Sequence, residues 1–182
     1  MTNLVQLKLY STVGNLPFHD FQVNGATTGK IVAKKFRLQP ELPGVIITKG
    51  TKMLGMISQV RFLEYMNLPR NKDFYSRQPV SELLDFLSIP PLVLSENFQI
   101  NAAVLTALNR PKNYVYEPIV IVLSNGNLRL IDLHDLLLAQ SEILLNAYKI
   151  IQDKTDKYQS EISELFPQDE DNDDEATGLL LE

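Results

Sequence analysis

Two stretches of the chain share one pattern of apolar and polar positions. In the first, the apolar run Val45–Ile47 precedes the polar segment Thr48–Lys52 and a second apolar run, Met53–Ile57. Short β-branched runs on either side of a Gly-containing break are typical of two strands joined by a tight turn. Ser58 then stands where a helix needs an N-cap. The apolar residues beyond it have helical spacing: Phe62, Leu63 and Met66.

The same pattern returns about 74 residues later. Ile119–Leu123 corresponds to the first strand, Ser124–Asn127 to the turn and Leu128–Ile131 to the second strand. Asp132 takes the place of the N-cap, and the helix after it carries Leu133, Leu136 and Leu137. The chain therefore contains an internal repeat, in which Pro43–Tyr65 matches Glu117–Ala139.

The match extends towards the N-terminus. Phe21–Asn24 reads FQVN and Phe98–Asn101 reads FQIN, and a helical apolar pattern follows each of them. Leu92–Leu94 predicts the first strand of the second unit, and Leu4–Tyr10 alternates like one additional strand. Both units therefore predict the order strand, helix, strand, strand, helix. Two copies of such a unit favour an α+β fold with pseudo-twofold symmetry rather than a long array.

One long helix is expected after the second unit. From Leu133 no helix-breaking residue occurs before Pro167. Leu144, Ile151, Tyr158 and Leu165 recur at heptad spacing, and three further residues precede the last three of these by three positions: Tyr148, Thr155 and Ile162. This a/d pattern predicts a coiled-coil connector over residues 144–166 that forms a homodimer, although the part up to Ile151 could instead pack on its own domain.

The end of the chain has a different composition. Gln168–Glu175 reads QDEDNDDE, which holds six acidic side chains and almost no apolar group. Such a segment repels itself and cannot bury a core, so we expect residues 167–182 to form a disordered acidic tail. The tandem domain then covers residues 1–143, with its two units at about 18–66 and 90–140.

Composition excludes several classes of protein. The chain has 182 residues, 45% of them hydrophobic, with no Cys, no Trp and a formal net charge of −5. Disulfides and thiolate metal sites are excluded, and the negative charge argues against nucleic acid as a partner. No signal peptide and no apolar run of about 20 residues is present, so we expect a cytoplasmic protein without a membrane span.

The sequence offers no candidate catalytic or metal site. His19 and His134 are its two histidines, and neither has metal-ligand spacing to a carboxylate cluster. No P-loop, no dinucleotide-binding fingerprint and no Gly-x-Ser-x-Gly motif occurs. We therefore expect a protein that is not an enzyme.

The repeated stretches GMISQVRFL (Gly55–Leu63) and RLIDLHDLL (Arg129–Leu137) resemble the closing motif of CBS domains, in the tandem arrangement called a Bateman module. FRLQPELPGVII and YEPIVIVLSNGNLRLIDLHDLLLAQSEI are similar to the CBS-like sensory region that precedes histidine kinase or diguanylate cyclase domains in some bacterial signalling proteins. The resemblance covers about Phe18–Ile143, and the duplication carries more of it than either motif does.

The resemblance implies a regulatory function and a ligand. In many family members the crevices between paired units bind adenine nucleotides, with a Thr or Ser hydroxyl towards phosphate and an Asp towards the ribose. By position, Ser58 is the retained hydroxyl of the first motif and Asp135 the retained acid of the second. Tyr114 and Tyr116, in the loop before the second repeat, are expected to face a crevice. No other cofactor is implied.

Three positions depart from the family pattern. Arg61 replaces the first Asp, Asp132 the second hydroxyl and Arg129 the second Gly. Asp132 at a helix start would repel phosphate, although Asp there is a good N-cap. The two arginines can hold an anion, or they can pair with a carboxylate of Asp132, Asp135 or Glu64. The sequence leaves open whether the module binds a nucleotide or has kept the fold and lost the ligand.

Two hypotheses for function follow. The first is a non-catalytic regulatory module that binds a ligand or a protein partner and transmits its state to a signalling output protein through the helix Leu133–Phe166. The second is an adaptor with an inert CBS-like body, whose helix and acidic tail bind a protein partner.

Overall fold

The structure is a computed structural model that describes residues 7–68, 71–87 and 89–166. Its elements, in chain order, are η1 (Val13–Asn15), β1 (Gln22–Asn24), α1 (Gly29–Leu38), β2 (Gly44–Lys49), β3 (Lys52–Ser58), α2 (Gln59–Asn67), α3 (Asn71–Tyr75), α4 (Val80–Leu87), β4 (Leu92–Ser95), α5 (Ile100–Leu108), β5 (Ile119–Val122), β6 (Leu128–Ile131) and α6 (Leu133–Leu165). The predicted acidic tail, residues 167–182, lies outside the described residues.

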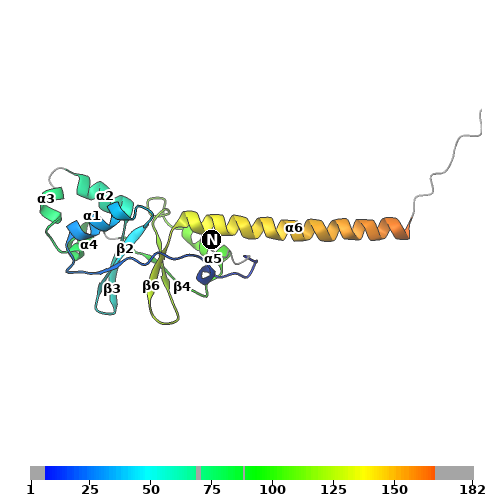
Figure 1. Cartoon of the computed structure of the whole chain (residues 1–182), viewed down its shortest axis with the longest axis horizontal. Coiled ribbons are helices and arrows are strands. Elements are labelled where there is room, and N and C mark those ends of the chain that lie inside the picture. Colours follow the sequence, from blue (N-terminus) through cyan, green and yellow to red (C-terminus); the bar gives the residue numbers. More distant parts are fainter. Residues whose placement is uncertain (1–6, 69–70, 88, 167–182) are drawn as a thin grey trace, which may run out of the picture.

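The strands form two sheets with the same topology. The orders are β1-β2-β3 and β4-β5-β6, and in each sheet the first pair of strands is parallel and the second antiparallel. The tight turns between the antiparallel strands contain Gly50 and Gly126, with φ of +63° and +80°. An L residue with a side chain is strained at such angles, which explains a glycine in each turn. The predicted α+β fold with two βαββα units is confirmed (Figure 1).

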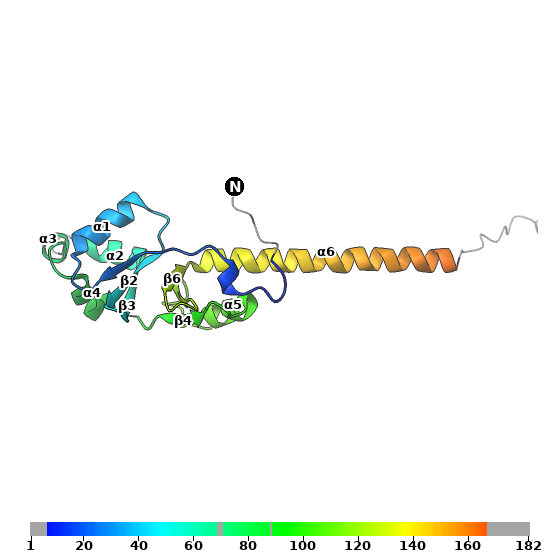
Figure 2. The ribbon, with the colours of Figure 1, turned by 60° about the horizontal axis from the view of Figure 1, so that its bottom comes forward.

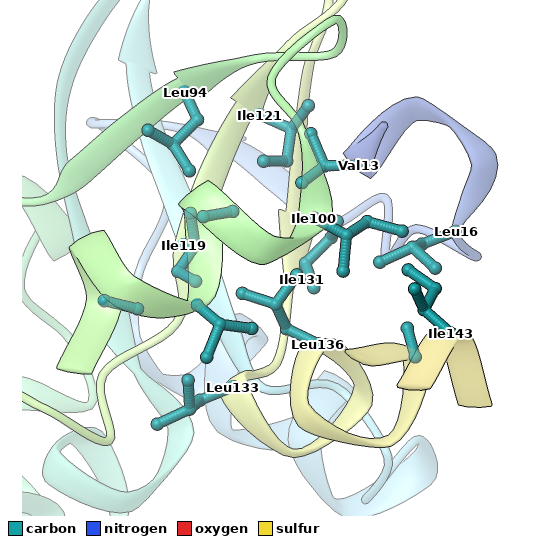
Figure 3. Packing of buried hydrophobic residues seen from close by; sticks show 14 of the residues in the cluster. Val13, Leu16, Leu94, Ile100, Ile119, Ile121, Ile131, Leu133, Leu136 and Ile143 are labelled. Carbon is teal, nitrogen blue, oxygen red and sulfur yellow. The ribbon is translucent and has the colours of Figure 1, made fainter. Parts of the chain in front are cut away.

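Each sheet packs its helices on one face. In the first unit, Val45, Ile47 and Ile57 point into a core with Phe36 of α1 and Phe62 of α2. In the second unit, Ile119, Ile121 and Ile131 pack against side chains of α5 and α6, as Figure 3 shows: Ile100, Leu133, Leu136 and Ile143. Val13 and Leu16 of the N-terminal segment complete this second core.

The opposite faces of the two sheets meet each other. Ile46 of β2, Met56 of β3, Val120 of β5 and Leu130 of β6 form a third buried cluster, each with an exposed fraction of 2% or less. We call these four residues the central cluster. Ile46 matches Val120 in the repeat, and Met56 matches Leu130. The strands therefore have both faces buried, which explains why their sequences are continuous apolar runs instead of alternating ones.

Two predictions from the sequence are wrong. β1 begins at Gln22, but Phe98–Asn101 does not correspond to it, because Phe98 follows β4 and Ile100 begins α5. The two FQxN motifs are therefore not structurally equivalent. The described part of the expected strand, Leu7–Tyr10, forms no strand; Leu7 is buried beside α6, and Asn146 donates a hydrogen bond to its carbonyl at 3.3 Å.

α1 begins with Gly29, although glycine disfavours helices, because a larger residue does not fit at this position. A Cβ at this position would lie 2.5 Å from the carbonyl oxygen of Tyr75. The amide of Gly29 also donates to the carbonyl of Gln78 at 3.1 Å. The segment after α3 therefore lies against the start of α1, at a distance that only glycine permits.

α6 is one continuous helix with two different environments. Its first part belongs to the second core through Leu133, Leu136, Ala139 and Ile143. Every residue from Tyr148 to Leu165 is exposed, and the helix projects away from both units (Figure 2). The prediction of one unbroken helix is confirmed.

The central cluster yields a test of the fold. Leu130→Ala should lower the free energy of unfolding by about 2–5 kcal/mol, because the cavity lies between two sheets that cannot both collapse on it. Leu38→Ala, at an exposed position at the end of α1, should change it by less than about 0.5 kcal/mol. Urea denaturation followed by circular dichroism measures both values. Equal losses in the two variants would contradict the packing of the two sheets on each other.

Candidate functional site

Ser58 lies at the junction of β3 and α2, where the two units face each other. It caps α2, and its hydroxyl oxygen accepts a hydrogen bond from the backbone amide of Arg61 at 3.5 Å. The residue is buried, with an exposed fraction of 5%. The predicted N-cap is thus confirmed, and the hydroxyl stands at the positive end of the α2 dipole.

Arg61, in the first turn of α2, reaches across to the loop before β5. Its Nε forms an ion pair with Glu117, and its Nη2 donates to the carbonyl of Asn113 at 2.7 Å. The guanidinium carbon lies 5.7 Å from the centre of the Tyr114 ring, within the range of a cation–π contact. One arginine of the first unit therefore binds three residues of a second-unit loop.

Glu117 is the acidic partner that the sequence did not reveal. The residue has an exposed fraction of 8%, and its Oε2 atom is buried without a hydrogen-bond partner in the described part of the chain. Nη2 of Arg110 donates to the carbonyls of Val115 and Glu117, at 2.8 and 2.7 Å. Burial lowers the pKa of Arg110, and the charge of Glu117 opposes this shift. Arg61 of the first unit thus pairs with the buried carboxylate, and Arg110 of the second unit holds the backbone around it.

The second motif forms a separate cluster at the start of α6. Asp132 caps the helix by accepting a hydrogen bond from the amide of His134 at 3.3 Å. Asp135 lies 3.8 Å from Nε2 of His19 and 3.6 Å from Nδ1 of His134. The backbone of His19 pairs with Leu130, with N–O distances of 2.9 and 3.0 Å, so the segment before β1 is held against β6.

Arg129 also joins this second cluster. Its Nη2 lies 3.1 Å from the carboxylate of Asp20, which neighbours His19. The sequence suggested Asp132, Asp135 or Glu64 as partners of the two arginines. In the described part of the chain each arginine instead pairs with an acid of the other unit: Arg61 with Glu117, and Arg129 with Asp20. Both arginines therefore connect the units through ion pairs.

The structure separates the predicted site residues into two groups. Ser58, Arg61 and Tyr114 come together at α2, and the rest of the charged set, Arg129, Asp132 and Asp135, lies at the start of α6. The Tyr116 side chain lies apart from both groups, with 81% of its surface exposed. Glu117 and Arg110 were missed because neither occupies a family motif position. The one available signal was an acid two residues before the apolar strand β5.

A metal site and a membrane-spanning helix are both absent from the residues that the structure describes. Among them, no group of three or more His, Cys, Asp or Glu side chains could hold a metal ion. None of the helices that the structure describes combines the length and apolar character needed to cross a membrane.

Comparison with solved structures shows the fold of the chain. It is similar to CBSX2 in complex with AMP, with a TM-score of 0.51 and 16% identity over 72% of this chain and 97% of that one. It is also similar to the CBS domain of the bacterial CNNM/CorC family Mg²⁺ transporter in complex with ATP, with a TM-score of 0.53 and 15% identity over 75% of this chain and 89% of that one. For a CBS domain pair/ACT domain protein from Thermotoga maritima, the TM-score is 0.52 and the identity 21%, over 73% of this chain and 98% of that one.

These similarities establish that the chain has the fold of a CBS-domain pair. No protein-family profile matches the sequence, and no curated protein matches it. With identities of 15–21% to the solved structures, what is shared is the arrangement of the elements. The site residues of this chain must be judged from their own contacts.

The two ion pairs should differ in their contribution to stability. Arg61→Ala leaves the buried carboxylate of Glu117 without its main partner and should cost about 1–3 kcal/mol of unfolding free energy. Arg129→Ala removes a pair whose acid, Asp20, is 59% exposed, and should cost less than about 1 kcal/mol. Urea unfolding curves of both variants measure the difference. Adding Glu117→Gln to Arg61→Ala should restore part of the loss, and no restoration would show that the pair is not the cause.

Proposed function

We propose that the chain is a non-catalytic regulatory module, which binds a ligand between its two units and transmits the bound state through α6. One observation carries this proposal. α6 starts at the second motif, where Asp132 caps it, and it contributes Leu133 and Leu136 to the second core. From Tyr148 it continues as a solvent-exposed helix to Leu165. A change at the motif therefore acts on a rigid element that leaves the domain.

A physical route connects the first motif to the same helix. Arg61 holds Glu117, and Pro118 after it leads directly into β5. β5 pairs with β6 along its whole length, from Ile119 with Ile131 to Val122 with Leu128, and β6 leads into α6. A ligand that draws Arg61 away from Glu117 would release the loop that positions β5. The second core would then transmit the change to α6.

We further propose an adenine nucleotide as the ligand. Two structures with this fold hold AMP or ATP. The first motif offers a buried hydroxyl at a helix N-terminus, Ser58, beside a guanidinium and a tyrosine ring, Arg61 and Tyr114. Phosphate groups favour that combination of donors and dipole. Arg129, Asp132 and Asp135 would contact a ligand at the second motif.

A second candidate function has its own support. The exposed part of α6 presents large apolar side chains to solvent, including Tyr148, Ile151 and Tyr158. An adaptor would use such a helix, together with the acidic segment Gln168–Glu175, to bind a protein partner. In the regulatory proposal the same surface receives a signalling output protein, and both proposals place the protein in the cytoplasm.

Calorimetry tests the ligand. Titration of the whole chain with AMP, ADP and ATP should give saturable heat with at least one of them. Arg61→Gln should weaken that binding about 10- to 100-fold, because a charge-assisted hydrogen bond is lost. Arg37→Gln, an exposed arginine of α1, is the matched control and should bind as the unmodified chain does. Absence of heat with all three nucleotides would overturn the ligand assignment.

Truncation separates the two functions. A chain that lacks residues 168–182 should keep its nucleotide affinity, because the proposed site lies between the units. An adaptor should instead lose its protein partner on the same deletion. Thermal shift with the nucleotide measures the first outcome. A truncated chain that no longer binds nucleotide would contradict a ligand site between the units.

A further inference from the structure

The projecting part of α6 carries a regular line of side chains that we call the α6 seam. Its members alternate at spacings of three and four: Ser141, Leu144, Tyr148, Ile151, Thr155, Tyr158, Ile162 and Leu165. Its six large apolar residues have exposed fractions between 56% and 73%. Alternation of three and four keeps all eight residues on one side of a helix and is the pattern of a coiled coil.

The seam does not serve the chain's own domain. The side of α6 that faces the core carries Leu133, Leu136, Ala139 and Ile143. That side continues into a groove shared with the N-terminal segment, where Ala147 and Ile150 lie near Leu7. The seam follows a different line, so its apolar groups have no role in the folding of the single chain. An exposed apolar stripe of this length marks a contact surface.

We infer that the α6 seam binds the same seam of a second copy of this chain, in a parallel two-stranded coiled coil. With Ser141, Tyr148, Thr155 and Ile162 at the a positions, the d positions hold Leu144, Ile151, Tyr158 and Leu165. Ile162 at a followed by Leu165 at d is the combination that favours two strands over three or four. This inference goes beyond the proposed function, since the dimer needs no ligand.

Thr155 is compatible with burial in such a seam. Its hydroxyl donates to the carbonyl of Ile151 at 2.9 Å, one turn earlier in the same helix. A buried hydroxyl costs stability only when it lacks a partner. Thr155 therefore enters the middle of the seam with its hydrogen bond already formed.

The flanking charges favour the parallel orientation. In a parallel pair, the g residues Lys154 and Glu161 face the e residues Gln159 and Phe166 of the other copy, so no like charges meet. An antiparallel pair that overlaps the whole seam instead places Lys154 opposite its own copy. Like charges across a helix pair are destabilising. The two CBS-like bodies then lie at the same end of the dimer.

Two neighbouring isoleucines give a matched test of the seam. Ile151 lies in it and Ile150 lies on the groove side of the helix; they are 63% and 56% exposed, so neither substitution opens a buried core. By sedimentation velocity without nucleotide, the unmodified chain should have twice its 20.7 kDa mass. Ile151→Lys should raise the dimer Kd at least about 30-fold, and Ile150→Lys less than about 3-fold. A monomer at all concentrations, a trimer, or equal effects of both variants would overturn the inference.

The absence of cysteine allows the orientation to be read directly. In Ile151→Cys the introduced thiol is the single one in the chain, and a parallel in-register dimer places the two copies of it opposite each other. Mild oxidation should convert most of this variant into a covalent dimer. The same oxidation of Ile150→Cys should not. A disulfide that forms only between mixed Ile151→Cys and Thr155→Cys chains would show the antiparallel arrangement and overturn the parallel one.

Discussion

The contact between the two sheets is the constraint on which the rest of the molecule depends. Ile46, Met56, Val120 and Leu130 fill it, one residue from each of the four strands that form the antiparallel pairs. Because each strand packs helices on its other face, neither sheet can shift without opening two cores at once. This contact fixes how the two repeat units face each other. It therefore sets the distance that Arg61 spans to reach Glu117.

The charged groups at the edge of that contact replace what the family motif would place there. Arg61 stands where the resemblance implies an acid, and the structure supplies the acid from the other unit, as Glu117. Arg129 has its own acid in Asp20 in the same way. A ligand must offer more than these internal partners do, since removing one member of a buried pair leaves the other uncompensated. Binding at the proposed site would thus be a competition with the protein's own side chains.

The sequence predicted local structure better than contacts between distant segments. Repeated apolar runs, Ser58 and Asp132 were sufficient to place strands and helix starts, because those signals act within a few residues. The likeness of FQVN and FQIN predicted two equivalent segments, but the first forms β1 and the second leads into α5. Nearly identical residues can lie in a strand or at a helix start according to what packs on them. Glycine disfavours a helix, and the reason for Gly29 at the start of α1 is a contact with Tyr75 that only the fold brings about. Glu117 became recognisable only when the fold brought it to Arg61.

The continuity of α6 limits the kind of signal that the proposed regulatory module could send. Leu144–Leu165 extends roughly 33 Å beyond the second core at the rise of an α-helix. Between Leu133 and Leu165 the helix contains no glycine or proline to act as a hinge, so a rotation imposed at Asp132 would be carried along one continuous element. The core residues Leu136 and Ile143 resist that rotation unless β6 moves with them. In the proposed function, the output would therefore be a reorientation of one continuous helix, and not the unfolding of a linker.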